Sequence, residues 1–420
     1  MRPGRRWETL RGVTRRSPIK VLIVGGGVAA LEALIALREL AEERVSIELV
    51  TPDAYFTYRP LEIAEPFGLG EAKRFDVVEI AAAHGAAVHL AGVQKVDADA
   101  HAVVSWDGRQ LTYDVLLVAI GAQLMTAVPG SITVGGPGYM GRFRGLLGEL
   151  RMGSVRDVAF AVPGGTSWPV PLYELALMTA NGLEKAGVRN TRLSLVTPEA
   201  SPVELFGRQA SDAMCELLEE HRIGIHAERV PVEFRAGELR VVPTDAIAAE
   251  RVVSLPRLVG PRLPGLPANA DGFIPVDLHG LVSGEEDIYA AGDATTSPIK
   301  QGGIATQQAD AAAEAIAARA GAPIEPKPFS PVLRGLLLTG SSPRYMRTDV
   351  SGGQGDDSAV AEHALWWPPS KIAGRWLAPY LALRHAELEE SPVGLPVEVP
   401  VAGPHAVRRA IIAPGIRLSR

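Results

Sequence analysis

Two glycine-containing segments, far apart in the chain, carry the clearest chemical signals in this sequence. The first is Gly25-x-Gly27-x-x-Ala30, which directly follows the apolar run 19–24. In such a pattern the first glycine permits a tight turn, the second lets the backbone approach a pyrophosphate, and the small third residue lets helix and strand pack closely. The amides that open the following helix favour negative charge. We expect this turn to bind a dinucleotide; a plain glycine-rich turn is the alternative.

The second segment places a carboxylate and a cation near the start of a long helix. A short stretch, Asp287-Ile288-Tyr289-Ala290-Ala291, leads into Gly292-Asp293, and Lys300-Gln301-Gly302-Gly303 precedes the Ala-rich stretch 303–320. Asp293 can accept a hydrogen bond from a ribityl hydroxyl. Reduced flavin carries negative charge at N1 and C2=O, for which a lysine and a helix N-terminus are suitable partners. These groups would suit a flavin; an aspartate helix cap beside a surface lysine is the alternative.

Composition excludes several other classes of protein. The chain of 420 residues is 47% hydrophobic and 21% charged, which is typical of a globular protein. Its net charge of −6 provides no basic field for a nucleic acid partner. Cys215 is the only cysteine, so an intrachain disulfide and a cysteine-based metal site are excluded. We find no apolar run of the roughly 18 residues that a spanning helix needs, and we predict no metal site.

Two similar sets of strands and helices are expected to position these residues. Leu49-Val50-Thr51-Pro52-Asp53-Ala54 is echoed by Leu195-Val196-Thr197-Pro198-Glu199-Ala200, and each closes the second strand of a β-α-β unit. The predicted fold is α/β, with two tandem doubly wound, Rossmann-like dinucleotide-binding domains and a C-terminal α+β cap module. The strands are expected at 19–24, 45–50, 114–119, 157–162 and 191–196, and the helices at 28–43, 171–187, 207–222 and 303–320.

The ordered segments resemble the FAD-dependent pyridine nucleotide–disulfide oxidoreductase superfamily. The similarity is greatest to its sulfide:quinone oxidoreductase, flavocytochrome c sulfide dehydrogenase and type II NADH dehydrogenase branch. It rests on the Gly25 turn, on 111–121, on 287–295, on 298–309 and on Tyr58-Arg59-Pro60. The resemblance implies that FAD is bound by Gly25, Gly27, Val28, Ala29, Ala30, Thr51, Arg59, Pro60, Val93, Ala119, Gly121, Gly292, Asp293, Lys300, Gln301, Gly302 and Gly303. It also gives Lys300 the role of stabilising the reduced flavin.

The expected domain order follows from this resemblance. Residues 18–130 and 257–325 form the FAD-binding domain, 131–256 form a second domain similar to an NAD(P)-binding domain, and 326–420 form the C-terminal module. Residues 1–17 are expected to be a disordered basic arm. The stretch 14–20 resembles a twin-arginine export signal, but cleavage after the apolar stretch 21–37 would destroy the cofactor turn. A cytoplasmic location is therefore expected.

The sequence departs from the superfamily pattern at three places. Thr51 stands where an acidic residue usually binds the adenosine ribose, with Asp53 two residues further on. Trp168 stands about where a redox cysteine would be, and Cys215 is expected to be a core thiol on an amphipathic helix. In the same loop, 163–174, Pro169 and Pro171 remove amide donors for a second pyrophosphate, so NAD(P)H binding at the second domain stays open.

We therefore expect an FAD-dependent oxidoreductase that passes two electrons through a non-covalent flavin to a quinone-like or protein acceptor without a cysteine disulfide relay. An NAD(P)H:acceptor reductase and a non-catalytic FAD-binding redox sensor or partner-binding protein are the alternatives. In the C-terminal module, Trp366, Trp367 and Lys371 form either a packing anchor or an aromatic platform near the flavin. The partners expected are a small-molecule or protein electron donor and acceptor, and no nucleic acid. Peripheral membrane contact through 372–383 and a homodimer stay open.

Overall fold

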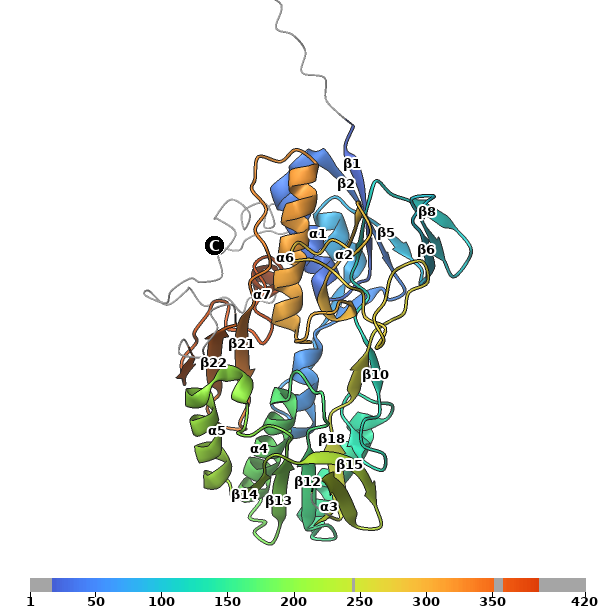
Figure 1. Cartoon of the computed structure of the whole chain (residues 1–420). Helices are drawn as coiled ribbons and strands as arrows, with labels where there is room; N and C mark the ends of the chain where they lie inside the picture. Colours follow the sequence, from blue (N-terminus) through green and yellow to red (C-terminus); the bar gives the residue numbers. More distant parts are fainter. Residues whose placement is uncertain (1–16, 244–245, 351–357, 385–420) are drawn as a thin grey trace, which may run out of the picture.

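The structure is a computed structural model that describes residues 17–243, 246–350 and 358–384. Two parallel sheets flanked by helices dominate it, one in the upper half of the view and one in the lower half (Figure 1). They confirm the predicted α/β class with two Rossmann-like units. All but the last residue of the predicted basic arm 1–17, and residues 385–420 of the predicted C-terminal module, lie outside the described residues.

The first sheet has the strand order of a doubly wound dinucleotide-binding fold. Its order is β20-β9-β1-β2-β5, with every pair parallel. The chain runs outward from the central β1 through β2 to β5 and then starts again on the other side of β1 with β9, so the switch point lies between β1 and β9. The strands are β1 (Ile19–Val24), β2 (Val45–Thr51), β5 (Ala87–Leu90), β9 (Val115–Val118) and β20 (Ile288–Ala290).

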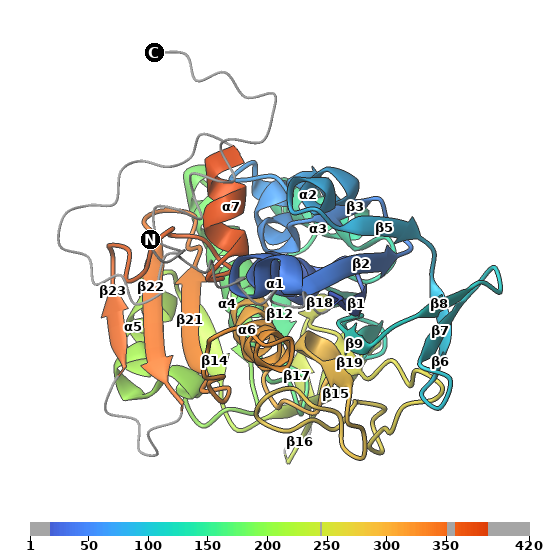
Figure 2. The same cartoon turned by 90° about the horizontal axis from the view of Figure 1, so that it is seen from above.

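Both faces of this sheet are covered. Val21 and Ile23 of β1 pack into one apolar cluster with the helices, while Leu22 and Val24 pack into a second cluster on the opposite face. This alternation explains why β1 is apolar throughout. The helices are α1 (Val28–Ala41), α2 (Val77–Ala83) and α6 (Gly302–Arg319), and the short η1 (Glu42–Arg44) follows α1. Seen from above, α1 and α6 lie side by side (Figure 2). Alanines of both helices are buried in one apolar cluster.

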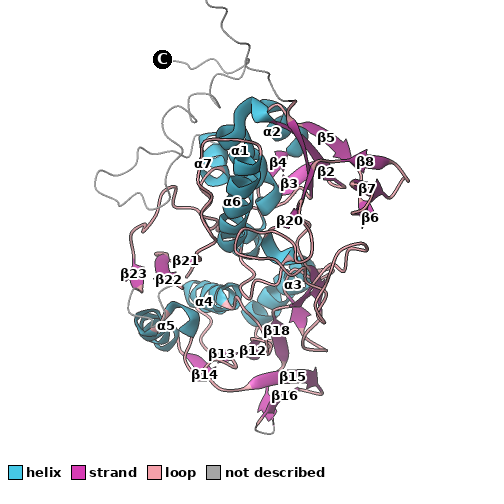
Figure 3. Cartoon of the chain, turned by 45° about the horizontal axis from the view of Figure 1, so that its top comes forward, coloured by secondary structure: helices cyan, strands magenta, loops and turns pink. Residues whose placement is uncertain are grey.

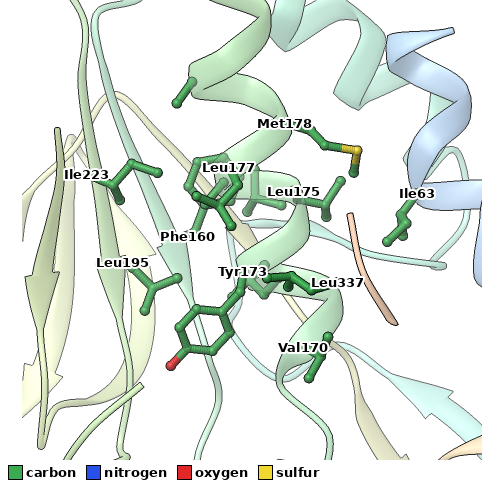
Figure 4. Close-up of a cluster of buried hydrophobic side chains, with 14 of the residues drawn as sticks. Ile63, Phe160, Val170, Tyr173, Leu175, Leu177, Met178, Leu195, Ile223 and Leu337 are labelled. Carbon is green, nitrogen blue, oxygen red and sulfur yellow. The ribbon is translucent and has the colours of Figure 1, made fainter. Parts of the chain in front are cut away.

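The second sheet repeats the same design. Its order is β11-β18-β12-β13-β14, again parallel. Side chains of α4 such as Leu177 and Tyr173 share a buried cluster with Phe160 and Leu195 of the strands (Figure 4). The strands are β11 (Ile132–Thr133), β12 (Asp157–Ala161), β13 (Arg192–Val196), β14 (Ile223–His226) and β18 (Arg251–Ser254), and the helices are α3 (Tyr139–Met152), α4 (Val170–Lys185) and α5 (Arg208–Glu220), with η3 (Glu204–Phe206).

Small antiparallel sheets complete the two units, and Figure 3 shows them beside the parallel sheets. The chain passes from the first unit to the second through β10 and returns through β19. These two strands pair with each other, with Gln123 opposite Val259. The predicted boundaries at 130 and 256 fall close to this pair and remain a proposal. The strands are β3 (Tyr55–Thr57) with β4 (Arg74–Asp76), β6 (Val93–Asp97) with β7 (Ala102–Ser105) and β8 (Gln110–Thr112), β10 (Gln123–Met125) with β19 (Arg257–Val259), and β15 (Val230–Arg235) with β16 (Glu238–Val242) and β17 (Ala246–Ala248).

The described part of the C-terminal module is a small sheet followed by a short helix. The sheet is β21 (Val332–Leu337), β22 (Arg344–Asp349) and β23 (Ala359–Ala361), and the helix is α7 (Leu377–Arg384). Glu32 of α1 fixes the start of α7, because its carboxylate accepts hydrogen bonds from the backbone N–H groups of Trp376 (2.7 Å) and Leu377 (2.8 Å). Burial raises the pKa of Glu32 to about 7, and the two backbone bonds oppose that shift.

The packing of Trp366 shows whether this residue is a packing anchor or part of an aromatic platform near the flavin. Trp366 is fully buried, meets the Tyr345 ring edge-on at 5.2 Å and donates its indole N–H to Ser370 (3.0 Å). Trp366 is therefore a packing anchor. The apolar side chains of α7, Leu377, Tyr380 and Leu381, are buried in the cluster that contains α1. None of the described helices is long and apolar enough to span a membrane.

Candidate functional site

The predicted pyrophosphate turn has the backbone shape that its glycines imply. Gly25 has a φ of +126°, and a Cβ there would lie 2.2 Å from the carbonyl oxygen of Ala119. Its N–H donates to the carbonyl of Val50 (2.8 Å). Gly25 thus lies at the switch point between β1 and β9, where only glycine combines this φ with such a close approach.

The next part of the turn faces open space and leaves the start of α1 without a cap. Gly27 is the N-cap residue of α1 and provides no side-chain hydrogen bond, and the first turn contains no acidic residue. A Cβ built on Gly27 would meet nothing within 4 Å. The positive end of the helix dipole and the free amides therefore face a space that suits a pyrophosphate.

The end of β2 carries the position that usually contacts the adenosine ribose. The Thr51 hydroxyl lies against Gly26, where a Cβ would come within 2.5 Å of it, and it accepts a hydrogen bond from the Asp53 N–H (3.3 Å). Thr51 is buried, whereas Asp53 is exposed. Both line the same cavity, and the Asp53 carboxylate is the more accessible group for a ribose hydroxyl.

Asp293 lies in a short turn that α6 positions. This turn is η4 (Gly292–Ala294), and Gly292 donates its N–H to the side-chain oxygen of Gln308 on α6 (2.7 Å). Burial raises the pKa of Asp293, while the Lys300 ammonium lowers it. No described residue donates a hydrogen bond to this half-buried carboxylate, which lines the cavity. A ribityl hydroxyl would provide the missing donor, so the site fits the predicted cofactor.

Lys300 occupies a half-buried position beside Asp293. Its ammonium lies 3.9 Å from the centre of the Phe273 ring and donates a hydrogen bond to the carbonyl of Thr295. Burial lowers the pKa of Lys300 to about 8, and the Asp293 carboxylate opposes this shift. The side chain lines the cavity, so its charge lies at the site and is sensitive to mildly alkaline pH.

A single cavity of about 1480 Å³ connects these groups. It exceeds the roughly 300–1,000 Å³ of ordinary small-molecule sites, and a dinucleotide requires such a large space. Every predicted cofactor residue lines it except Ala30 and Gly303. Ala30 and Gly303 are buried behind the lining, in α1 and α6. That position agrees with the packing role that the turn pattern assigns to Ala30.

Two further segments border the cavity from other parts of the chain. Arg59 and Pro60, which the sequence placed in a loop, begin the 3-10 helix η2 (Arg59–Phe67) and line the cavity. The neighbouring Tyr58 hydroxyl accepts a hydrogen bond from the backbone N–H of Ile372 (2.9 Å). Ile372 lines the cavity too, and a Cβ on Gly302 would come within 2.8 Å of its side chain. The C-terminal module therefore closes one side of the site.

A buried ion pair joins this module to the second unit. The Lys371 ammonium contacts both carboxylate oxygens of Glu174 on α4, at 2.6 and 2.8 Å, and the Leu338 N–H donates to the same carboxylate (2.7 Å). Burial raises the pKa of Glu174, and Lys371 opposes that shift. Lys371 lines the cavity. The sequence singled out Lys371, but it gave no signal for Glu174 as its partner.

The second unit has a different turn where the first has its glycines. Pro169 is the N-cap residue of α4, Pro171 follows within its first turn, and neither has an N–H. The Leu172 N–H is already bonded to the Pro169 carbonyl (2.9 Å). Trp168 packs edge-on against Phe206 at 5.6 Å. This helix start offers few free amides for a pyrophosphate.

Cys215 is less buried than the sequence suggested. It is half-buried on α5, whereas Met214 and Leu218 form the core face of that helix. The expectation of a core thiol is therefore corrected: Cys215 lies at the edge of the buried face of α5. Burial raises the pKa of the thiol, the nearby Asp212 raises it further, and Cys215 does not line the cavity.

The family of this chain can now be stated. The pyridine nucleotide-disulphide oxidoreductase family matches residues 19–313, and the chain belongs to that family. Over 189 residues the chain is 26% identical to the sulfide-quinone reductase of Aquifex aeolicus (strain VF5). That match spans 43% of this chain and 43% of the relative, which is less than half the length of each.

Solved structures show the same fold over a longer part of the chain. The sulfide:quinone oxidoreductase of Aquifex aeolicus has a TM-score of 0.72 at 19% identity, covering 82% of this chain and 86% of its own. The putidaredoxin reductase–putidaredoxin complex gives a TM-score of 0.58 at 19% identity, covering 80% and 83%. NDH2 of Plasmodium falciparum, in complex with NADH, gives 0.54 at 16% identity, covering 67% and 65%.

Proposed function

We propose that this protein is an FAD-dependent oxidoreductase that passes two electrons through a non-covalent flavin to a quinone-like or protein acceptor, without a cysteine disulfide relay. The observation that carries the proposal is the cavity, which joins the Gly25–Gly27 turn to Asp293 and Lys300 and continues to Lys371 of the C-terminal module. Membership of the oxidoreductase family supports the same conclusion.

The residues of this chain would hold the cofactor by three kinds of contact. The turn at Gly25 and Gly27 and the start of α1 would bind the pyrophosphate. Asp293 would accept a hydrogen bond from the ribityl chain, and Lys300 would provide positive charge at neutral pH because its pKa of about 8 keeps it largely protonated there. When bound, FAD supplies the two-electron chemistry, and the protein supplies binding, orientation and charge.

The lining of the cavity near the C-terminal module supports an apolar acceptor. Leu336 and Ile372 of the C-terminal module line the cavity, as do Ile63 of η2 and Tyr139 of α3. The buried Lys371–Glu174 pair joins the module to α4. A flat, apolar quinone would suit these side chains. The likeness to a reductase in complex with putidaredoxin supports a protein acceptor as the second choice within the same class.

Two observations set the proposal apart from its neighbours' chemistry. Cys215 is the only cysteine and does not line the cavity, which argues against a disulfide relay. The prolines at the start of α4 leave few amide donors for a second dinucleotide, which argues against NADH or NADPH as the donor. Because the solved structure of Plasmodium falciparum NDH2 is in complex with NADH, NADH and NADPH are the two electron donors to test first.

An anaerobic experiment on the flavin tests the proposal. The purified protein is expected to be yellow, and its oxidised flavin is expected to keep its visible absorbance when NADH or NADPH is added. After photochemical reduction, a water-soluble quinone should restore that absorbance, and repeated cycles would distinguish an enzyme from a sensor. A colourless protein that FAD cannot reconstitute, or rapid bleaching by NADH, would overturn the proposal.

A further inference from the structure

Trp106 is the most exposed tryptophan that the structure describes. It follows β7 at the turn that leads to β8, and 71% of its surface is accessible to solvent. A large aromatic side chain in that position leaves apolar surface in water at a cost in free energy. Yet the same side chain lines the cavity of the predicted cofactor, together with Gly92 and Val93.

The indole lies against the backbone of Gly92. The backbone N–H of Trp106 donates to the Gly92 carbonyl (2.8 Å), which fixes the main chain at position 106 beside Gly92. A Cβ built on Gly92 would lie 2.3–2.4 Å from three carbons of the Trp106 ring, so the ring lies directly over the space that a side chain would fill. Glycine at position 92 is what allows the indole to rest there.

The turn around Trp106 is also fixed by its own contacts. The Gly108 N–H donates to the Ser105 carbonyl (2.9 Å), and the Ser105 N–H donates to the Arg109 carbonyl (3.0 Å). The Arg109 guanidinium contacts the Asp107 carboxylate at 2.7 Å. The indole is thus presented from a stable hairpin, which reduces the entropy cost of using it as a binding surface.

The strand order shows which part of a dinucleotide would reach this indole. The pyrophosphate belongs to the turn after β1, and the ribose belongs to the end of β2. β5 is the next strand, with Thr51 of β2 opposite Leu90, and it leads directly into 91–93. The base therefore lies one strand beyond the ribose, at the end of β5 where Trp106 covers Gly92.

We propose that Trp106 stacks against the adenine ring of FAD and covers it from solvent. This inference rests on the proposed function, because it assumes that FAD is the cofactor. Stacking on an aromatic side chain needs only the flat face of a base and no hydrogen bond to its edge. It would bury the exposed indole face and hold the adenine end of the cofactor in place.

Titration of the apoprotein with FAD tests this assignment through affinity rather than activity. Trp106→Ala is expected to weaken FAD binding by roughly ten- to hundredfold, as aromatic stacking on a base implies. Trp106→Phe keeps a flat ring and should retain affinity closer to wild type. Met152→Ala is the matched control, because Met152 is 77% exposed and does not line the cavity; it should bind FAD like wild type.

A second variant moves the indole without removing it. Gly92→Ala forces its methyl group into the indole carbons, so it should weaken FAD binding in the same direction as Trp106→Ala. If wild type binds FAD and both Trp106→Ala and Gly92→Ala bind it equally well, the stacking role is wrong while the proposed function stands. If wild type itself cannot bind FAD, the proposed function fails first.

Discussion

The two β-α-β units of this chain share a plan but differ at the position where a dinucleotide binds. In the first, the turn between β1 and α1 is Gly25-Gly26-Gly27, and the start of α1 has free amides beside open space. In the second, the corresponding helix start contains Pro169 and Pro171. Under the proposed function, both units have the same fold, and the donors at the helix start make only the first of them a nucleotide site.

The ends of the second strands differ in a complementary way. In the first unit, Asp53 follows Thr51 and is exposed at the cavity. In the second, Glu199 occupies the equivalent place but accepts hydrogen bonds from the hydroxyls of Tyr173 (2.6 Å) and Thr197 (2.8 Å). Burial raises the pKa of Glu199, and these two hydroxyls oppose the shift. The Glu199 carboxylate, which could otherwise bind a ribose, is thus already hydrogen-bonded within its own unit.

The largest expected effect comes from the glycine turn. Gly25→Ala should lose both thermal stability and FAD, because its methyl group would meet the Ala119 carbonyl at 2.2 Å with φ at +126°. Gly27→Ala should leave the melting temperature of the apoprotein unchanged, since nothing lies within 4 Å. Its methyl group points into the space for the pyrophosphate, so FAD affinity should fall by about 1–3 kcal/mol.

Flavin content after purification and melting curves of the apoproteins measure both effects. Gly145→Ala is a suitable control, since Gly145 lies on α3 of the second unit with open space around it. It should keep full FAD content. Equal FAD affinity in Gly27→Ala and wild type would contradict the assignment of the Gly25–Gly27 turn as the pyrophosphate site.

Asp293→Ala should have the next largest effect. The variant removes the charged acceptor for a ribityl hydroxyl, and hydrogen bonds to charged groups contribute about 1.5–3 kcal/mol. Fluorescence titration with FAD measures the loss, with the exposed Asp99→Ala as a control. Unchanged FAD affinity would remove Asp293 from the cofactor site.

These two regions also show what the sequence could and could not predict. The Gly25 turn, Gly292 and Asp293 are read from local patterns, because the strand before each and the helix after each lie next to them in the chain. The hydrogen bond that Glu199 accepts from the Tyr173 hydroxyl could not be predicted, since the two residues lie 26 positions apart in the chain. Likewise, the contact of Tyr58 with Ile372 spans 314 residues and leaves no local signature.

Lys300→Met is expected to lower the midpoint potential of the flavin. A partly buried charge a few ångströms away interacts by about 1–4 kcal/mol, or roughly 20–90 mV for a two-electron couple. The pKa of Lys300 is about 8, so the charge is present below that pH and lost above it. Spectroscopic redox titrations should therefore separate the two proteins well below pH 8 and bring them together well above it.

The same titration can contradict this role. Curves for wild type and Lys300→Met that coincide at every pH would mean that the ammonium does not act on the flavin. The cation would then serve only to pack against Phe273 and bind the Thr295 carbonyl. The start of α6 would remain as the source of positive potential.

The smallest effect is expected at Cys215. Cys215→Ser should leave FAD content and turnover unchanged, because the thiol lies outside the cavity and its raised pKa keeps it protonated near neutral pH. Turnover assays on matched preparations check this. Loss of turnover with flavin and fold intact would mean that the thiol takes part in the reaction. The sequence placed Cys215 on the correct helix but misjudged its burial, because Cys215 lies at the edge of the face that Met214 and Leu218 bury.

The most direct test of the difference between the two units is a count of dinucleotide sites. Calorimetric titration of the apoprotein with FAD, followed by titration of the FAD-loaded protein with NADH and NADPH, reports each site separately. We predict one FAD per chain and no saturable binding of either nicotinamide dinucleotide. A second saturable site on the FAD-loaded protein would show that the α4 turn still binds a dinucleotide, and the absence of any FAD binding would contradict the assignment of the first unit.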